Sequence, residues 1–197
     1  MRKVIVNEFL TLDGVVQAPG GVDEDREGGF AHGGWQMPYA DEIFGKTIIE
    51  GIAQAGGFLL GRRTYEIFAA YWPNAPEEEQ VVAVPLNAAP KYVASRTLSG
   101  PLEWENSSLL VGDVAEAVAA LKQEPGKDIQ VIGSGNLVQT LTQHGLVDEY
   151  LLMIHPLSVG GGKRLFRDDG ERRSFQLADS QVTTTGVIMA TYRPPEA

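Results

Sequence analysis

Short apolar runs alternate along the chain with segments in which apolar residues recur every three or four positions. Runs rich in Val, Ile, Leu and Phe predict β-strands, and the helical recurrence predicts α-helices that bury one face. The clearest helical stripe is formed by Phe44, Ile48 and Ile52. The predicted strands cover residues 3–12, 56–61, 91–95, 108–111, 128–133 and 147–159, and the predicted helices cover residues 38–55, 62–72, 113–123 and 136–145.

The order of these elements indicates an α/β fold. Strands alternate with helices through the middle of the chain, and residues 174–194 then predict two antiparallel strands around a turn. This order is typical of a mostly parallel sheet with antiparallel strands at its edge. Residues 75–90 are rich in glutamate and proline, so we expect a polar connection there. No repeat or linker divides the sequence, and we expect a single domain over residues 1–197.

Charge and composition narrow the function classes. A net charge of −10 and a pI near 4.7 argue against nucleic acid or an anionic membrane as the main partner. The chain has no cysteine and its three histidines lack metal-ligand spacing, so we expect no metal site. No signal peptide pattern and no apolar run of membrane-spanning length is present in the sequence, and the expected location is the cytoplasm.

The predicted strand that ends at Gly61 leads directly into a predicted helix. Backbone N–H groups at a helix N-terminus favour an anion, and the guanidinium groups of Arg62 and Arg63 match phosphate geometry. Thr64 would cap the helix or bind a phosphate oxygen. The alternative is an ordinary turn with two solvated arginines.

Two further strand ends carry similar chemistry. Ser95 and Arg96 follow the next strand, where Arg96 would read a second phosphate or would simply be solvated. Gly133-Ser134-Gly135 joins a third strand to a helix, but Val138 stands where the dinucleotide fingerprint requires a third glycine. A tight turn is the alternative there. Taken together, the three strand ends suit an extended ligand with several phosphates.

Five segments, in order over nearly the whole chain, resemble the dihydrofolate reductase-like superfamily. The resemblance is to the branch shared with the C-terminal reductase domain of bacterial riboflavin biosynthesis (RibD). It implies a three-layer α/β domain with helices on both faces of the sheet, bound NADPH or NADP, and a homodimer. The segments are "NEFLTLDGVV" (7–16), "LLGRRTYE" (59–66), "KYVASRTL" (91–98), "VIGSGNLVQTL" (131–141) and "DEYLLMIHPLSVGGGKRLF" (148–166).

The resemblance also implies which residues would hold the cofactor. The loop from Asp13 to Val16 would lie beside the nicotinamide, and the phosphates would lie between three groups of residues. Dihydrofolate reductases have two glycines joined by a cis peptide bond at the position of Gly133-Ser134, so we predict a cis bond here. The phosphate-binding candidates are Gly61, Arg62, Arg63 and Thr64, then Ser95 and Arg96, then Gly133, Ser134, Gly135, Asn136 and Leu137.

The substrate side is less defined. Folate reductases use a carboxylate on the first helix, and here Asp41 and Glu42 are the candidates for a proton donor. Alternatively, Glu42 lies on a solvated face near Lys46, and Asp41 is stabilised by the helix dipole. Trp35 and Tyr39 would stack on a planar substrate or would anchor their loop. Asp13 is a third candidate for substrate contact.

Residues 18–35 form a long loop rich in glycine and acid, which we predict to be a lid. The zinc-deaminase signature that accompanies many riboflavin reductases is missing, so a stand-alone reductase-like domain is expected. The leading hypothesis is an NADPH-dependent reductase of a small pterin- or pyrimidine-like heterocycle. The alternative is a nucleotide-binding module of the same fold that has no turnover.

Overall fold

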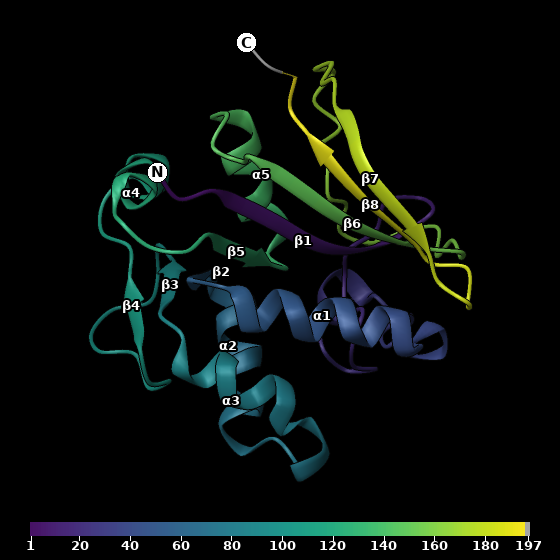
Figure 1. The fold of residues 1–197 in the computed structure, drawn as a ribbon, viewed down its shortest axis with the longest axis horizontal. Helices are drawn as coiled ribbons and strands as arrows, with labels where there is room; N and C mark the ends of the chain where they lie inside the picture. Colours follow the sequence, from purple (N-terminus) through teal and green to yellow (C-terminus); the bar gives the residue numbers. More distant parts are fainter. Residues whose placement is uncertain (196–197) are drawn as a thin grey trace.

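The computed structural model describes residues 1–195, and its eight strands form one mixed sheet in the order β4-β3-β2-β5-β1-β6-β8-β7 (Figure 1). The neighbours from β4 to β6 are parallel, and β8 and β7 are antiparallel, which confirms the predicted fold class. The strands are β1 (Val4–Thr11), β2 (Gly57–Gly61), β3 (Lys91–Ala94), β4 (Ser107–Leu109), β5 (Ile129–Ile132), β6 (Glu149–His155), β7 (Gln176–Val182) and β8 (Ile188–Arg193).

Helices cover both faces of the sheet. One face carries α1 (Glu42–Gln54), α2 (Arg62–Tyr71) and α3 (Gln80–Ala88), and the other carries α4 (Val114–Gln123) and α5 (Gly135–Gln143) (Figure 1). Within residues 1–195, no helix is long and apolar enough to cross a membrane. Four short 3₁₀ turns complete the helical structure, at Glu27–Gly29, Met37–Tyr39, Trp72–Asn74 and Glu77–Glu79.

The alternation of β1 sorts its side chains between the two faces. Val6 and Leu10 are buried in the core cluster that contains residues of α4 and α5. Phe9 points to the opposite face, where it packs with Phe44 of α1 at a centroid distance of 5.6 Å. Because a strand alternates strictly, Asn7 shares the face of Phe9, and Glu8 shares the face of Val6 and Leu10.

The expectation of a polar connection over residues 75–90 is wrong, because Gln80–Ala88 forms α3. Leu86 is buried in the cluster beneath α1, α2 and α3, and Ala83 is fully buried as well. This burial compensates for the helix hydrogen bond that Pro85 removes. The buried ammonium of Lys91 donates hydrogen bonds of 2.7–3.1 Å to three carbonyl oxygens at the end of α3. These bonds satisfy carbonyls that the helix itself leaves free.

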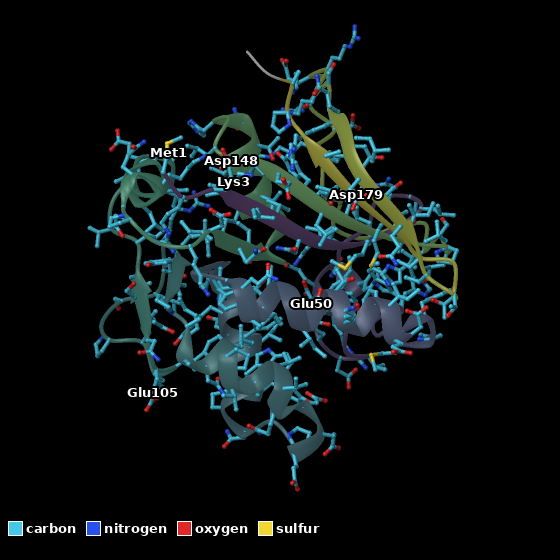
Figure 2. The ribbon with its side chains drawn as sticks, in the orientation of Figure 1. Met1, Lys3, Glu50, Glu105, Asp148 and Asp179 are labelled. Atoms are coloured by element: carbon cyan, nitrogen blue, oxygen red, sulfur yellow. The ribbon has the colours of Figure 1, made fainter. Side chains whose placement is uncertain are left out.

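The sheet ends in a β7–β8 hairpin, as the sequence predicts. Every residue of β7 is exposed to solvent, and its pairing with β8 shifts register between Leu177 and Asp179. Asp179 lies on this outermost strand (Figure 2). Glu50 lies on the exposed side of α1 (Figure 2), where its Oε1 is 3.8 Å from Lys46 Nζ.

Candidate functional site

A cavity of about 1530 Å³ lies where β1, β2, β3 and β5 end and α2 and α5 begin. Pockets for one small molecule usually measure about 300–1,000 Å³, so this cavity has room for a dinucleotide and a second small molecule. All of the cofactor-binding candidates line it: Val16, Gly61, Arg62, Arg63, Thr64, Ser95, Arg96, Gly133, Ser134, Gly135, Asn136 and Leu137.

A hydrogen-bonded junction joins the starts of α2 and α5. The Ser134 hydroxyl accepts a bond of 2.8 Å from the Gly61 N–H and donates one of 2.7 Å to Thr64 Oγ1. A Cβ atom on Gly61 would lie 2.9 Å from the Ser134 side chain, so only glycine allows this close approach. The two turns that were predicted separately are therefore one unit, which we call the α2–α5 junction.

The prediction of a cis bond between Gly133 and Ser134 is wrong, since no peptide bond in residues 1–195 is cis. Instead, Gly133 and Ser134 both adopt the left-handed region, with φ of 62° and 70°. Two successive residues with positive φ thus connect β5 to α5 without a cis bond. The hydroxyl contacts of Ser134 at the junction hold a conformation that non-glycine residues seldom adopt.

The first amides of α5 are available to a ligand. Leu137 and Val138 donate to the Ser134 carbonyl at 2.7 and 3.1 Å, whereas the N–H groups of Gly135 and Asn136 have no acceptor among residues 1–195. The first turns of α2 and α5 contain no acidic residue. Free amides at the positive end of a helix bind anions, so the junction fits a phosphate.

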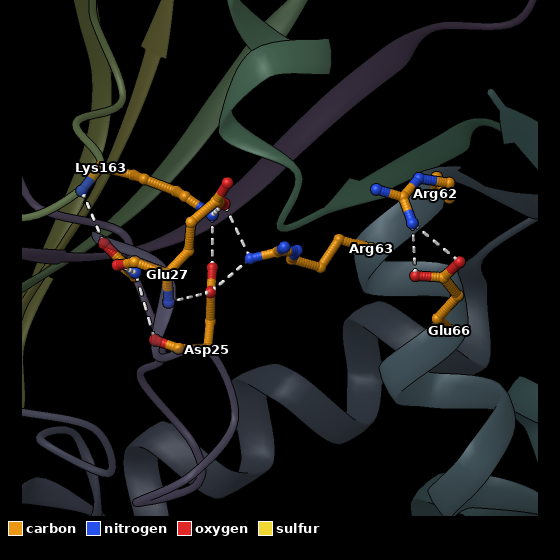
Figure 3. A network of polar contacts seen from close by, with 7 residues as sticks. Asp25, Glu27, Arg62, Arg63, Glu66 and Lys163 are labelled. Carbon is orange, nitrogen blue, oxygen red and sulfur yellow. Dashed lines mark hydrogen bonds and ion pairs between the residues drawn. The ribbon is translucent and has the colours of Figure 1, made fainter. Parts of the chain in front are cut away.

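Two of the predicted phosphate-binding arginines are engaged within the chain (Figure 3). Arg62 binds Glu66 at 3.0 Å on the surface of α2. Arg63 binds Asp25 at 2.5 Å and Glu27 at 2.8 Å, and Lys163 binds the same carboxylates at 2.6 and 2.5 Å. We call residues 25–27 the acidic strap, because they connect α2 to the loop after β6 along the cavity wall.

The acidic strap is ionised and fixed. Burial opposes ionisation of Asp25, whose side chain is 10% exposed, but the ammonium of Lys163 and the guanidinium of Arg63 lower its pKa. A hydrogen bond from Lys163 likewise lowers the pKa of Glu27. The Gln17 amide donates to the carbonyls of Asp25 and Glu27 at 3.1 and 3.0 Å. Arg96 lines the cavity, is exposed, and has no side-chain partner in the described part of the chain.

The two proton-donor candidates do not line the cavity. Asp41 caps α1, accepting from the Phe44 N–H at 2.8 Å and from Thr184 at 2.6 and 2.7 Å, and the Thr184 contact lowers its pKa. Glu42 is exposed on the first turn of α1. Glu42 therefore fits the solvated alternative, and Asp41 lies at the start of α1, where it caps the helix.

The aromatic candidates anchor the loop. Trp35 and Tyr39 pack edge-on against the fully buried His155, at centroid distances of 5.1 and 5.7 Å, and both lie outside the cavity lining. Trp35 also donates to the Gln17 carbonyl at 2.8 Å. Asp13 accepts from Thr11 and from backbone amides, which lower its pKa to about 2, and it lines a separate cavity of about 440 Å³.

Two buried polar features of the sheet at this cavity were not predicted. Glu8 is 3% exposed, its Oε1 has no partner among residues 1–195, and burial raises its pKa to about 8. A lone acid within the apolar run 4–10 was the sequence signal for it. On the opposite face, the Asn7 amide donates to Gln130 Oε1, and both residues line the cavity. Asn7 and Gln130 are 123 positions apart in the sequence, so no pattern within one segment predicts that they pair.

Comparison with known proteins agrees with the resemblance found in the sequence. The family model described as "RibD C-terminal domain" matches residues 2–189. The uncharacterized Bacillus subtilis (strain 168) protein YyaP is 30% identical over 97% of this chain and 94% of its own length. A second uncharacterized protein of that strain, YwjB, is 25% identical over 85% of this chain and 84% of its own.

Two solved structures share the fold. The first, a "Putative riboflavin biosynthesis protein" from Shewanella sp. PV-4, is 21% identical with a TM-score of 0.68, over 98% of this chain and 99% of its own. The second, a "pyrimidine reductase-like protein" from Corynebacterium diphtheriae, is 13% identical with a TM-score of 0.69, over 100% of this chain and 93% of its own.

Proposed function

Because the chain belongs to the RibD C-terminal domain family, we propose that it is an NADPH-dependent reductase of a small pterin- or pyrimidine-like heterocycle. The α2–α5 junction carries this proposal, since it presents two free helix amides in a cavity large enough for a dinucleotide and a substrate. The likeness in fold to a protein described as pyrimidine reductase-like is consistent with the substrate class.

The residues of the chain bind and orient in this proposal, and bound NADPH supplies the hydride. The amides of Gly135 and Asn136 would hold the pyrophosphate, and Arg96 would hold the 2′-phosphate because it has no competing partner in the described chain. Val16 contacts the start of α5, where a Cβ atom on Gly135 would lie 3.3 Å from its Cγ2. By the resemblance to dihydrofolate reductases, the nicotinamide would lie beside Val16.

A nucleotide-binding module without turnover is the second candidate. It is favoured by the positions of Asp41 and Glu42, neither of which reaches the cavity, and by Glu8, whose side chain lies on the face opposite to Asn7 and Phe9. A reductase needs a proton as well as a hydride, and the α1 side of the cavity contains no carboxylate from α1 to provide it.

Titration with NADPH and NADH tests the shared part of both candidates. Trp72 lines the cavity, so its fluorescence should change on binding. We expect NADPH to bind more tightly than NADH, and Arg96→Ala to remove roughly tenfold of that preference, the value of one charge-assisted hydrogen bond. Equal binding of both cofactors by the wild type would remove Arg96 from the site.

Consumption of NADPH then separates the two candidates. The assay follows NADPH absorbance in the presence of a panel of oxidised pterins and pyrimidines. Turnover of any member supports the reductase. Tight NADPH binding with no turnover across the panel supports the binding module.

A further inference from the structure

We infer that Asn7 and Gln130 select the substrate, by binding the edge of a neutral planar heterocycle that presents a ring N–H beside a carbonyl, that is, a cyclic amide. The role as substrate selector rests on the proposed function, but binding of the cyclic amide does not. The inference rests on two side-chain amides that project from the sheet into the cavity. Asn7 and Gln130 are hydrogen-bonded to each other, and this bond leaves one hydrogen-bond acceptor and one donor group of the pair without a partner.

The orientation of both amides follows from one carbonyl group. Asn7 Nδ2 lies 3.3 Å from the Ile5 carbonyl oxygen, which can only accept, so the NH₂ group of Asn7 must point there. The second hydrogen of the same NH₂ group binds Gln130, which must therefore present its Oε1. Neither amide can be flipped without placing two acceptors or two donors against each other.

This orientation leaves Asn7 Oδ1 as a free acceptor and Gln130 Nε2 as a free donor group. Neither atom has a hydrogen-bond partner among residues 1–195, and neither is sealed from solvent in the way that Glu8 Oε1 is. Gln130 is only 9% exposed, and that exposure is into the cavity that it lines. A ring N–H of a ligand matches Asn7 Oδ1, and the adjacent ring carbonyl matches Gln130 Nε2.

The surroundings favour a neutral ring. In the strand register, Asn7 lies between Ile132 and Leu151, and Gln130 pairs with Phe58. These three apolar neighbours also line the cavity, together with Phe9 and Phe44. An ionised group on the ligand would lose its hydration here without a counter-charge, whereas a planar uncharged ring would pack against the apolar walls.

The test compares the binding of quinazolinone, a planar cyclic amide, with that of methoxyquinazoline, which has the same ring system but no N–H beside a carbonyl. Binding is measured by calorimetry with the free protein and with the protein saturated with NADP. We expect quinazolinone to bind at least about tenfold more tightly, the combined effect of two neutral hydrogen bonds. Failure of quinazolinone to bind, or equal binding of the two probes, overturns the inference.

The variant Gln130→Met keeps the shape of the side chain and removes the donor. We expect its preference for quinazolinone to fall to roughly threefold, because the bond from the ring N–H to Asn7 Oδ1 remains. Gln139→Met makes the same chemical change elsewhere in the cavity, where Gln139 contacts Arg164 and Arg167, and should keep the wild-type preference. A full preference in Gln130→Met contradicts the inference.

A second variant tests the inference if Gln130→Met does not fold. Gln130→Glu keeps the oxygen that accepts from Asn7 and replaces the donor by an acceptor, so it should lower the preference at least as far as Gln130→Met does. Retention of the full preference contradicts the inference. Failure of the proposed function gives a different result. If NADP does not bind but the free protein still prefers quinazolinone, the cofactor assignment fails and the cyclic-amide site stands.

Discussion

Replacing Glu8 with Gln should flatten the dependence of protein stability on pH. The Glu8 carboxyl is buried and unpaired, and burial raises its pKa from 4.5 to about 8. Between these two values the folded protein keeps a proton that the unfolded chain has lost. The free energy of unfolding therefore falls as the pH rises through this window, because the unfolded state binds fewer protons.

The size of the effect follows from the shift in pKa. Each unit of pKa shift corresponds to about 1.36 kcal/mol. The difference between about 8 and 4.5 then gives a loss of about 5 kcal/mol on going from acid to alkaline conditions. Gln has nearly the same shape as Glu but does not ionise, so Glu8→Gln lacks this loss.

Urea unfolding of both proteins across the window measures the difference directly. The two unfolding free energies should diverge in favour of Glu8→Gln as the pH rises from about 5 to about 8, and stay parallel below about pH 4. Glu42→Gln, at an exposed acid of α1, is the matched control and should follow the wild type. Parallel curves for Glu8→Gln and wild type across the whole range would refute the buried, unpaired state of Glu8.

Three other outcomes follow from the site. The double change Asp25→Asn with Glu27→Gln should release Arg63 and Lys163 from their ion pairs with the acidic strap. The affinity for inorganic pyrophosphate, measured by calorimetry, should then increase roughly tenfold. An unchanged affinity would show that the strap does not compete with phosphate for these cations. Gly61→Ala should lower the free energy of unfolding by about 1–3 kcal/mol in urea because its Cβ would meet Ser134, while Gly45→Ala, with open space around it, should not destabilise. Asp41→Ala should cost about 0.5–2 kcal/mol of stability through loss of the α1 cap and leave NADPH affinity unaltered; reduced affinity would return Asp41 to the site.

Much of the fold could be predicted because its signals are local. The apolar runs and helical stripes give most elements, and Gly61, Ser95 and Gly133 mark strand ends that meet at one edge of the sheet. The helix α3 was missed because Pro85 and the run of glutamates before it resemble a loop. Its helical state depends on burial of Leu86 against residues distant in sequence.

The site was predictable only where a single segment carries the chemistry. The start of α5 contains its own free amides, so the sequence of this one segment is enough to identify it as a candidate anion site. By contrast, the capping role of Asp41 depends on Thr184, and the pairing of Arg63 depends on Asp25 in the loop across the cavity. Partners of this kind are set by tertiary structure, and no spacing rule within one segment identifies them.

The outer edge of β7 bears on how the folded chain could pair with other molecules. This strand ends the sheet, so one side of its backbone offers N–H and C=O groups to which a strand of another molecule could add. Leu177 and Val182 are exposed on it at 56% and 61%, which favours such addition. The shifted register and the charge of Asp179 oppose it, because they break the flat, uncharged edge that aggregation requires. Bulges and charges of this kind are the features by which natural proteins keep edge strands from pairing with other chains.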